Sequence, residues 1–318
     1  MTDLPDGLLR YRLQNPRQVV TLEQLMEHWF QVDIRVHLTS GVEAVSNQDP
    51  SVADRLRGAL GRALMEVASA EAVSGRPCPW DPACTLDVLW GDMGTVRRGV
   101  QVPKPFVIRV LPAPGGGTDI CLSLFGQATD WAEAVADGLI RALRGGVSLD
   151  GGPRRPYDPQ ARCVQPVDAG PLWDALRPVD AGSTGADALM LLFETPLATR
   201  QGEDLTIDCR ALLTGLSRRA EGMARWHDSH LAVEGQALAD AASVLSVQTS
   251  HLRPRHWRRP PNRQRTHDIP LGGFVGPYLL SGPVWAIDHI TPLLVLGQAF
   301  GAGSHTALGL GRYRLAPL

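Results

Sequence analysis

Hydrophobic and polar residues alternate strictly over residues 32–38 of this chain. The apolar positions are Val32, Ile34, Val36 and Leu38, and the polar positions between them are Asp33, Arg35 and His37. A period of two residues is typical of a strand that buries one of its faces. We therefore expect Arg35 and His37 to lie together on the polar face of a strand.

After residue 50 the apolar residues recur every three or four positions, which is the spacing of one helix face. They are Val52, Leu56, Leu60, Ala63 and Val67. The elements predicted after this helix are strands over 86–90, 105–111 and 119–125, a helix over about 130–144, and a weak strand within 160–167.

The second half of the chain predicts a similar order of elements. They are a strand over 188–194, a helix over 205–223, strands over 243–252 and 272–282, and a final strand over 307–315. Before the final strand, Thr291, Pro292 and Gly301 are the residue types expected at the N-cap, first turn and C-cap of a short helix. An arginine-rich segment lies in the connection between the two middle strands.

Both halves fit the order strand, helix, two strands, helix, strand. This order predicts an α+β fold of two tandem ferredoxin-like, RNA-recognition-like βαββαβ domains. We expect the first domain over residues 1–150 and the second over 186–318. The intervening segment 151–185 is rich in Gly, Pro and Asp with little periodicity, so it is the expected linker.

Composition limits the possible partners. The chain has 318 residues and a formal net charge of −2, so any nucleic-acid site has to be local. Its 31 Lys and Arg residues include one lysine, Lys104, a bias that a GC-rich genome alone could cause. Five scattered cysteines without a signal peptide indicate a reducing cytoplasm, and no apolar run approaches the roughly 20 residues that cross a membrane.

The arginine-rich segment, residues 253–265, contains six arginines and no acidic residue. It also contains Trp257, and positive charge beside an aromatic ring is expected where RNA or single strands bind. A solvated arginine-rich hairpin without a ligand is the alternative. The glycine-rich segment 301–311 lacks the Gly-Lys-Ser/Thr element of a P-loop and the strand–helix context of a dinucleotide fingerprint.

Two C-terminal stretches, "HWRRPPNRQRTHDIPLGGFVG" and "LLVLGQAFGAGSHTALGLGRYRL", resemble the C-terminal signature of a known family. It is the family of CRISPR precursor-RNA-processing endoribonucleases, the repeat-processing branch of the RAMP superfamily. The matching positions are Trp257, Arg263, Gln264, Leu271 to Phe274 and Gly301 to Arg312. Shorter stretches at 56–64, 78–84, 103–112 and 191–200 agree with the resemblance.

The resemblance implies a metal-independent endoribonuclease that needs no cofactor. In this family the 2′-hydroxyl before the scissile phosphate attacks in line, leaving a 2′,3′-cyclic phosphate or 3′-phosphate and a 5′-hydroxyl. The implied partners are CRISPR repeat RNA, to whose product the protein stays bound, and other subunits of a CRISPR effector complex. The alternative is a RAMP subunit that binds and caps crRNA without cutting it, and a generic single-strand RNA-binding protein is a more distant one.

Such chemistry needs a proton carrier and positive charge on the transition state. Family members often place the catalytic histidine near the first strand and first helix, which makes His37 the leading candidate, with Arg35 stabilising the charge. His267 and His305 are alternatives, and a solvent-facing strand histidine without a function is another.

The remaining predicted site residues are assigned to RNA binding. They are Arg253, Arg255, Trp257, Arg258, Arg259, Arg263, Gln264, Arg265, Gly301, Gly303, His305, Gly309, Gly311 and Arg312. The glycines are expected to let backbone amides approach phosphates, and a purely structural turn is the alternative. We expect no metal site, because neither His227 with His230 nor Cys78 with Cys84 has an obvious second pair of ligands.

Overall fold

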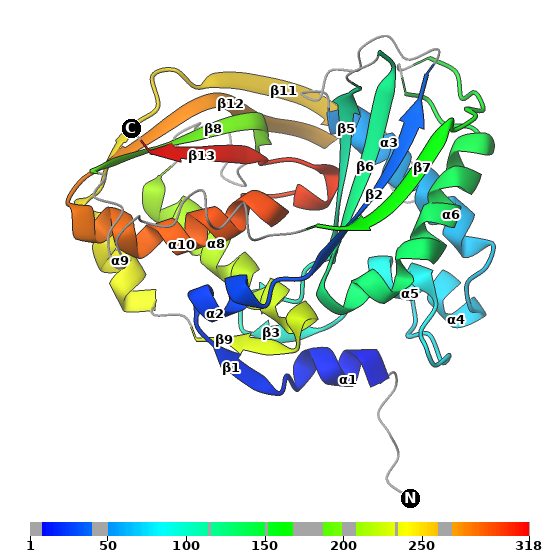
Figure 1. Cartoon of the computed structure of the whole chain (residues 1–318), viewed down its shortest axis with the longest axis horizontal. Helices are drawn as coiled ribbons and strands as arrows, with labels where there is room; N and C mark the ends of the chain where they lie inside the picture. The colour runs from blue at the N-terminus through cyan, green and yellow to red at the C-terminus, as the bar shows by residue number, and fades with distance from the viewer. Residues whose placement is uncertain are drawn as a thin grey trace, which may run out of the picture. The chain divides into compact units, whose positions relative to one another are not determined.

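The computed structural model describes residues 8–39, 50–113, 116–149, 152–167, 187–198, 208–232, 235–259 and 269–317. The chain forms two compact units (Figure 1). The first contains Met1–Ser46, Val52–Ala169 and Glu221–Ala232, and the second contains Asn47–Ser51, Gly170–Ala220 and Val233–Leu318. In the described residues, no helix is long and apolar enough to cross a membrane.

The first unit is built around a four-stranded antiparallel sheet with the strand order β5-β6-β2-β7. Its strands are β2 (Gln31–Leu38), β5 (Phe106–Pro112), β6 (Thr118–Phe125) and β7 (Ala161–Pro166). Helix α3 (Pro50–Met65) follows β2, and helix α6 (Ala132–Arg144) follows β6. This is the ferredoxin-like order, because the first strand in sequence lies between the third and the fourth.

The apolar residues of β2 are buried and its polar face is partly open, which confirms the predicted strand. Helices α3 and α6 pack closely on each other. At Gly138 of α6 an added Cβ would lie 2.7 Å from Leu64 of α3, closer than ordinary van der Waals contact. Strand β7 lies within the segment 151–185 that was expected to be a linker, and it pairs with β2 in the first sheet.

Shorter elements complete the first unit. They are α1 (Leu8–Gln14), β1 (Gln18–Val20), α2 (Leu22–Glu27), α4 (Ala70–Val73), α5 (Thr85–Trp90), β3 (Thr95–Arg97), β4 (Val100–Gln101), β9 (Ser229–Leu231) and the 3-10 helices η1 (Gly126–Trp131) and η2 (Arg225–His227). The prediction of a strand over 86–90 is wrong, because these residues form helix α5. A short apolar run fits a buried helix as well as a buried strand, and here every residue from Thr85 to Leu89 is buried.

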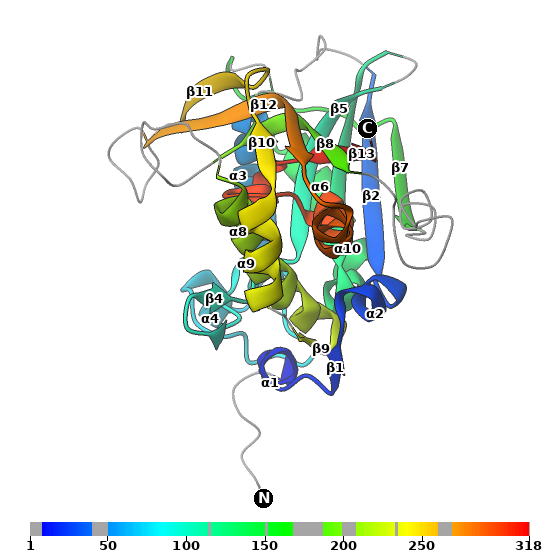
Figure 2. The same cartoon turned by 90° about the vertical axis from the view of Figure 1, so that its left-hand side faces the viewer.

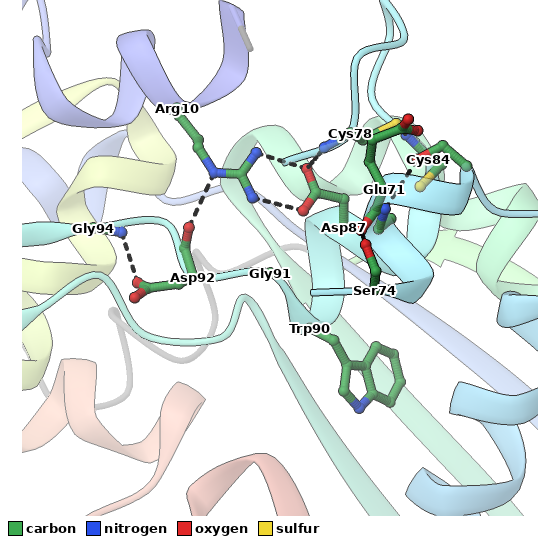
Figure 3. Close-up of polar contacts among 12 residues, drawn as sticks. Arg10, Glu71, Ser74, Cys78, Cys84, Asp87, Trp90, Gly91, Asp92 and Gly94 are labelled. Atoms are coloured by element: carbon green, nitrogen blue, oxygen red, sulfur yellow. Dashed lines mark hydrogen bonds and ion pairs between the residues drawn. The ribbon is translucent and has the colours of Figure 1, made fainter. Parts of the chain in front are cut away.

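Asp87 connects three parts of the first unit (Figure 3). Its carboxylate accepts two hydrogen bonds from the Arg10 guanidinium, at 2.6 and 2.8 Å, and a third from the Cys78 amide at 3.1 Å. Arg10 also donates to the Asp92 carbonyl at 3.0 Å. The Cys84 amide donates to the Cys78 sulfur at 3.3 Å, so this bond joins the two ends of the loop that precedes α5 in the chain.

His227 is a buried titratable group of the first unit. Its ring stacks on the Trp29 indole with the centroids 4.3 Å apart, and its Nδ1 accepts the Phe30 amide at 3.4 Å. The residue as a whole keeps some exposure, but its Nε2 is shielded from solvent. Burial lowers the pKa of His227 to about 3, because the charged imidazolium would be poorly solvated there.

This histidine is expected to make the protein sensitive to acid. Between pH 6.5 and about 3 the unfolded chain binds a proton at His227 and the folded chain does not, so the free energy of unfolding falls as the pH falls. His227→Phe is expected to flatten this dependence by up to about 1.4 kcal/mol per pH unit, the value for one proton. Urea unfolding at several pH values measures it, with exposed His28→Phe as control. Parallel pH profiles for both variants would contradict the expectation.

The second unit contains a five-stranded antiparallel sheet. Strand β8 (Ala188–Leu197) lies between β12 (Ile269–Ser281) and β13 (Tyr313–Pro317), and both β10 (Ser246–Gln248) and β11 (Arg253–Arg259) pair with the other edge of β12. The helices are α8 (Cys209–Ala224), α9 (Gly235–Val244) and α10 (Val284–Phe300), with the 3-10 helix η3 (Thr306–Leu308). The strand order is again ferredoxin-like, which confirms the predicted fold class.

Three predictions for the second unit are wrong. Residues 243–252 do not form one strand, because α9 extends to Val244 and only Ser246–Gln248 pairs with β12. The arginine-rich segment is not only a connection, because its first part is strand β11. Helix α10 begins before Thr291 and contains Pro292, and the Thr291 hydroxyl donates to the Ile287 carbonyl at 2.7 Å. The helix ends at Gly301, as predicted.

Candidate functional site

His37 lies on the polar face of β2, opposite Asp119 of β6 in the register of the sheet. The His37 Nδ1 and the Asp119 Oδ1 are 2.8 Å apart. The His37 side chain is 27% exposed and that of Asp119 is 12% exposed. A carboxylate at Nδ1 fixes the orientation and tautomer of an imidazole, which leaves Nε2 as the nitrogen that can exchange a proton with a bound molecule.

Arg35 lies two residues before His37, and its side chain is exposed. The burial pattern of β2 confirms that the two residues share one face, because Ile34 and Val36, which alternate with them, point into the core. The Arg35 guanidinium is charged at every physiological pH, as arginine side chains ordinarily are, and the nearby Cys121 sulfur raises its pKa further. A fixed positive charge therefore lies on the same face as an oriented histidine.

A polar network that the sequence did not predict continues along this face. The Ser123 hydroxyl donates to Asp33 at 2.6 Å, and Arg109 of β5 donates to Ser123. The Gln31 amide donates to the same Asp33 oxygen at 2.9 Å. The alternation of β2 indicated that Asp33 faces this side, but Ser123 and Arg109 come from strands that follow much later in the chain.

The arginine-rich segment supplies the candidate RNA-binding residues of the second unit. Arg253 and Arg255 are exposed on β11, and Trp257 is half-buried two residues further along the strand. The backbone of Arg258 and Arg259 continues the strand. Arg263, Gln264 and Arg265 lie outside the described residues, as does His267.

The glycine-rich segment folds back on itself. Gly301, Gly303, Gly309 and Gly311 all have positive φ angles, between 67° and 78°. The Ala302 amide donates to the Gly311 carbonyl, and the Gly311 amide donates to the Pro196 carbonyl, each at 2.9 Å. The Thr195 hydroxyl at the end of β8 donates to the Gly309 carbonyl at 2.8 Å.

These bonds decide which part of the segment a ligand could reach. The glycines at 301, 309 and 311 are buried, whereas Gly303 and His305 are exposed. Contact between a phosphate and this segment is therefore expected only around Gly303–His305. Arg312, at its end, forms an ion pair with Glu194 at 2.9 Å.

The predicted residues thus gather in two sets, each within its own unit. His37 and Arg35 lie with Asp119 on the face of the first sheet. Arg253 and Arg255 lie on β11 of the second sheet, and Arg312 pairs with Glu194 of β8. An oriented histidine beside a fixed positive charge, and an arginine-bearing sheet, are suited to phosphodiester chemistry and to RNA binding.

Comparison with solved structures finds proteins that are similar to this chain in fold. The product complex of Cas6 (TTHA0078) matches with a TM-score of 0.51 and 19% identity over 90% of this chain and 99% of that chain. Thermus thermophilus Cas6 (TTHB231) matches with a TM-score of 0.43 and 16% identity over 91% and 98%. A partial Cas6-RT-Cas1–Cas2 complex matches with a TM-score of 0.48 and 12% identity over 91% and 46%. The first of these matches supports the tandem ferredoxin-like fold of the chain.

Sequence comparison makes the assignment more specific. Residues 191–313 match the model of the family described as CRISPR-associated endoribonuclease Cas6. Among curated proteins no match was found. The matched residues include the first of the two C-terminal stretches and all but the last two residues of the second. This part of the chain is similar to the Cas6 family.

Proposed function

We propose that this protein is a metal-independent endoribonuclease that cleaves CRISPR repeat RNA to mature crRNA. The hydrogen bond between His37 and Asp119 carries this proposal, because it holds a proton-transfer group in a defined orientation on an accessible face. The match of residues 191–313 to the Cas6 family supports repeat RNA as the substrate.

In this mechanism the Nε2 of His37 accepts the proton of the 2′-hydroxyl that precedes the cut. The 2′-oxygen then attacks the adjacent phosphorus, the bond to the 5′-oxygen breaks, and a proton is transferred to that leaving oxygen. The products are a 2′,3′-cyclic phosphate and a 5′-hydroxyl. Arg35 stabilises the negative charge that builds up on the phosphoryl oxygens, since its guanidinium stays charged.

The second unit holds the RNA through the residues assigned to binding in its arginine-rich and glycine-rich segments. We further propose that the protein stays bound to its product and works with other CRISPR proteins. Two observations on Cas6 proteins support this: one was solved with its product, and another was solved as part of a complex with Cas1 and Cas2.

Cleavage of an end-labelled cognate repeat RNA in EDTA tests the proposal. Cleavage is expected to continue in EDTA and to be abolished by a 2′-deoxy group at the nucleotide before the cut, because that RNA lacks the attacking oxygen. Tight binding without product under every condition would contradict the proposal and favour a subunit that binds and caps crRNA without cutting it.

A further inference from the structure

The second sheet has a pocket at the point where its edge strand is interrupted. Figure 2 shows β10 and β11 following one another along β12. Residues 249–252 between them leave the sheet, at the level of Phe274 to Gly276, where the register between β12 and its other neighbour, β8, shifts. Gly276 has a φ of +113°, and an added Cβ would lie 2.9 Å from the His251 carbonyl oxygen. The turn 249–252 is thus held close to the sheet and forms one wall of the pocket.

The pocket opens on the face of the sheet that the helices do not cover. The aromatic rings of Phe193, Tyr278 and Tyr313 lie on the helix side, where the Tyr313 hydroxyl donates to the Leu294 carbonyl of α10 at 2.6 Å. Leu192 and Glu194 alternate with Phe193 along β8, so they point to the opposite side. The cavity has a volume of about 750 Å³.

The lining of this cavity combines positive charge with an apolar floor. Its basic residues are His251, Arg253, Arg255 and Arg314, and its acidic residue is Glu194. Glu194 already forms ion pairs with both Arg312 and Arg314. Leu192, Val275 and Pro277 supply apolar surface. Positive charge exceeds negative charge around the cavity, so it favours a ligand with an anionic part and a flat apolar part.

A nucleotide has both parts. A guanidinium can donate two parallel hydrogen bonds to a phosphate, and a base can stack on apolar or guanidinium surface. The volume lies within the range of roughly 300–1,000 Å³ that is typical of small-molecule sites. A base-paired nucleotide would bring its partner strand with it, whereas a single unpaired nucleotide can enter the pocket alone.

We propose that this pocket binds one unpaired nucleotide of the RNA, with the phosphate at Arg253, Arg255 and Arg314 and the base against Pro277 and Leu192. The inference rests on the proposed function in that it takes RNA as the ligand. It adds a subsite for single-stranded RNA beside the beginning of β11, the strand that carries Arg253 and Arg255.

Binding of a fluorescein-labelled, unstructured RNA tetranucleotide to the full chain tests the proposal by anisotropy. Arg314→Ala removes a pocket cation, and Arg210→Ala removes an exposed arginine on α8 of the same unit. Ser250→Glu adds a negative charge at the pocket rim, and Ser243→Glu adds the same charge on α9. Each pocket variant is expected to raise the Kd at least about 10-fold, and each control less than about 2-fold. Uridine 5′-monophosphate is expected to compete at lower concentration than inorganic phosphate.

Three results would contradict the proposal that this pocket binds a nucleotide. They are wild-type affinity in both pocket variants, equal losses in pocket and control variants, and competition by inorganic phosphate as effective as that by the nucleotide. Cleavage of repeat RNA by the same wild-type preparation separates this inference from the proposed function. If the wild type cleaves repeat RNA and the pocket variants bind the tetranucleotide like the wild type, only the pocket proposal is contradicted. If the pocket variants bind more weakly but the wild type does not cleave, the pocket proposal is supported and the proposed nuclease activity is contradicted.

Discussion

His37→Ala is expected to lower the single-turnover rate of repeat cleavage at least about 100-fold, as the loss of a general base does. The imidazole is held by Asp119 at 2.8 Å, so the group that we propose as the proton acceptor is oriented before RNA binds. The affinity for repeat RNA is expected to change little, because the arginines of the second unit are untouched. Rapid-quench measurement at saturating enzyme separates the cleavage rate from the Kd.

Two further variants define what this result means. Asp119→Asn is expected to give a smaller loss of rate at unchanged Kd, because the amide can still contact Nδ1 but favours a different tautomer. His28→Ala removes an exposed histidine of the same unit and is expected to cleave like the wild type. A His37→Ala variant that cleaves at the wild-type rate would assign the proton transfer to another group.

Asp87→Ala is expected to lower the free energy of unfolding by about 3–5 kcal/mol, the range for breaking a buried ion pair by removing one partner. The Asp87 side chain is 2% exposed and that of Arg10 is 15% exposed. The substitution leaves the Arg10 guanidinium and the Cys78 amide without their shared acceptor. Urea denaturation followed by tryptophan fluorescence measures the loss.

Asp137→Ala is the matched control for this substitution. Asp137 also pairs with an arginine, Arg162, at 2.7 Å, but its side chain is 56% exposed. Exposed ion pairs contribute about 0–1 kcal/mol, so the control is expected to unfold almost like the wild type. Equal losses in the two variants would show that burial does not decide the strength of the Asp87 pair.

Much of the fold could be predicted because its signals are local. The alternation over 32–38 and the apolar stripe from Val52 onward depend only on neighbouring residues. The structure has a strand at the first and a helix at the second, as predicted. Residues 86–90 could not be predicted in the same way. Whether a short apolar run forms a helix depends on its surroundings, and here Asp87 binds Arg10, 77 residues earlier in the chain. Thr291 and Pro292 look like a helix start, yet the helix continues through them.

The candidate site shows a similar division between local and distant information. The shared face of Arg35 and His37 follows from the period of a strand. Predicting the pairing of His37 with Asp119 requires the register of β2 and β6, which joins residues 82 positions apart.

Predicting the pocket on the second sheet requires more information than a register. The pocket arises where a segment that looks like one strand is interrupted by a turn, and this turn packs close to the sheet.

The packing of the glycine-rich segment bears on how proteins that carry this segment evolve. At Gly311 a side chain would collide with the Ala302 carbonyl, and the φ of +67° also disfavours other residues. Selection for a folded protein is therefore enough to retain this glycine, whether or not the protein cuts RNA. A descendant of this protein that lost His37 would keep the Gly-Leu-Gly-Arg signature, so the signature records common ancestry and does not by itself record enzymatic activity.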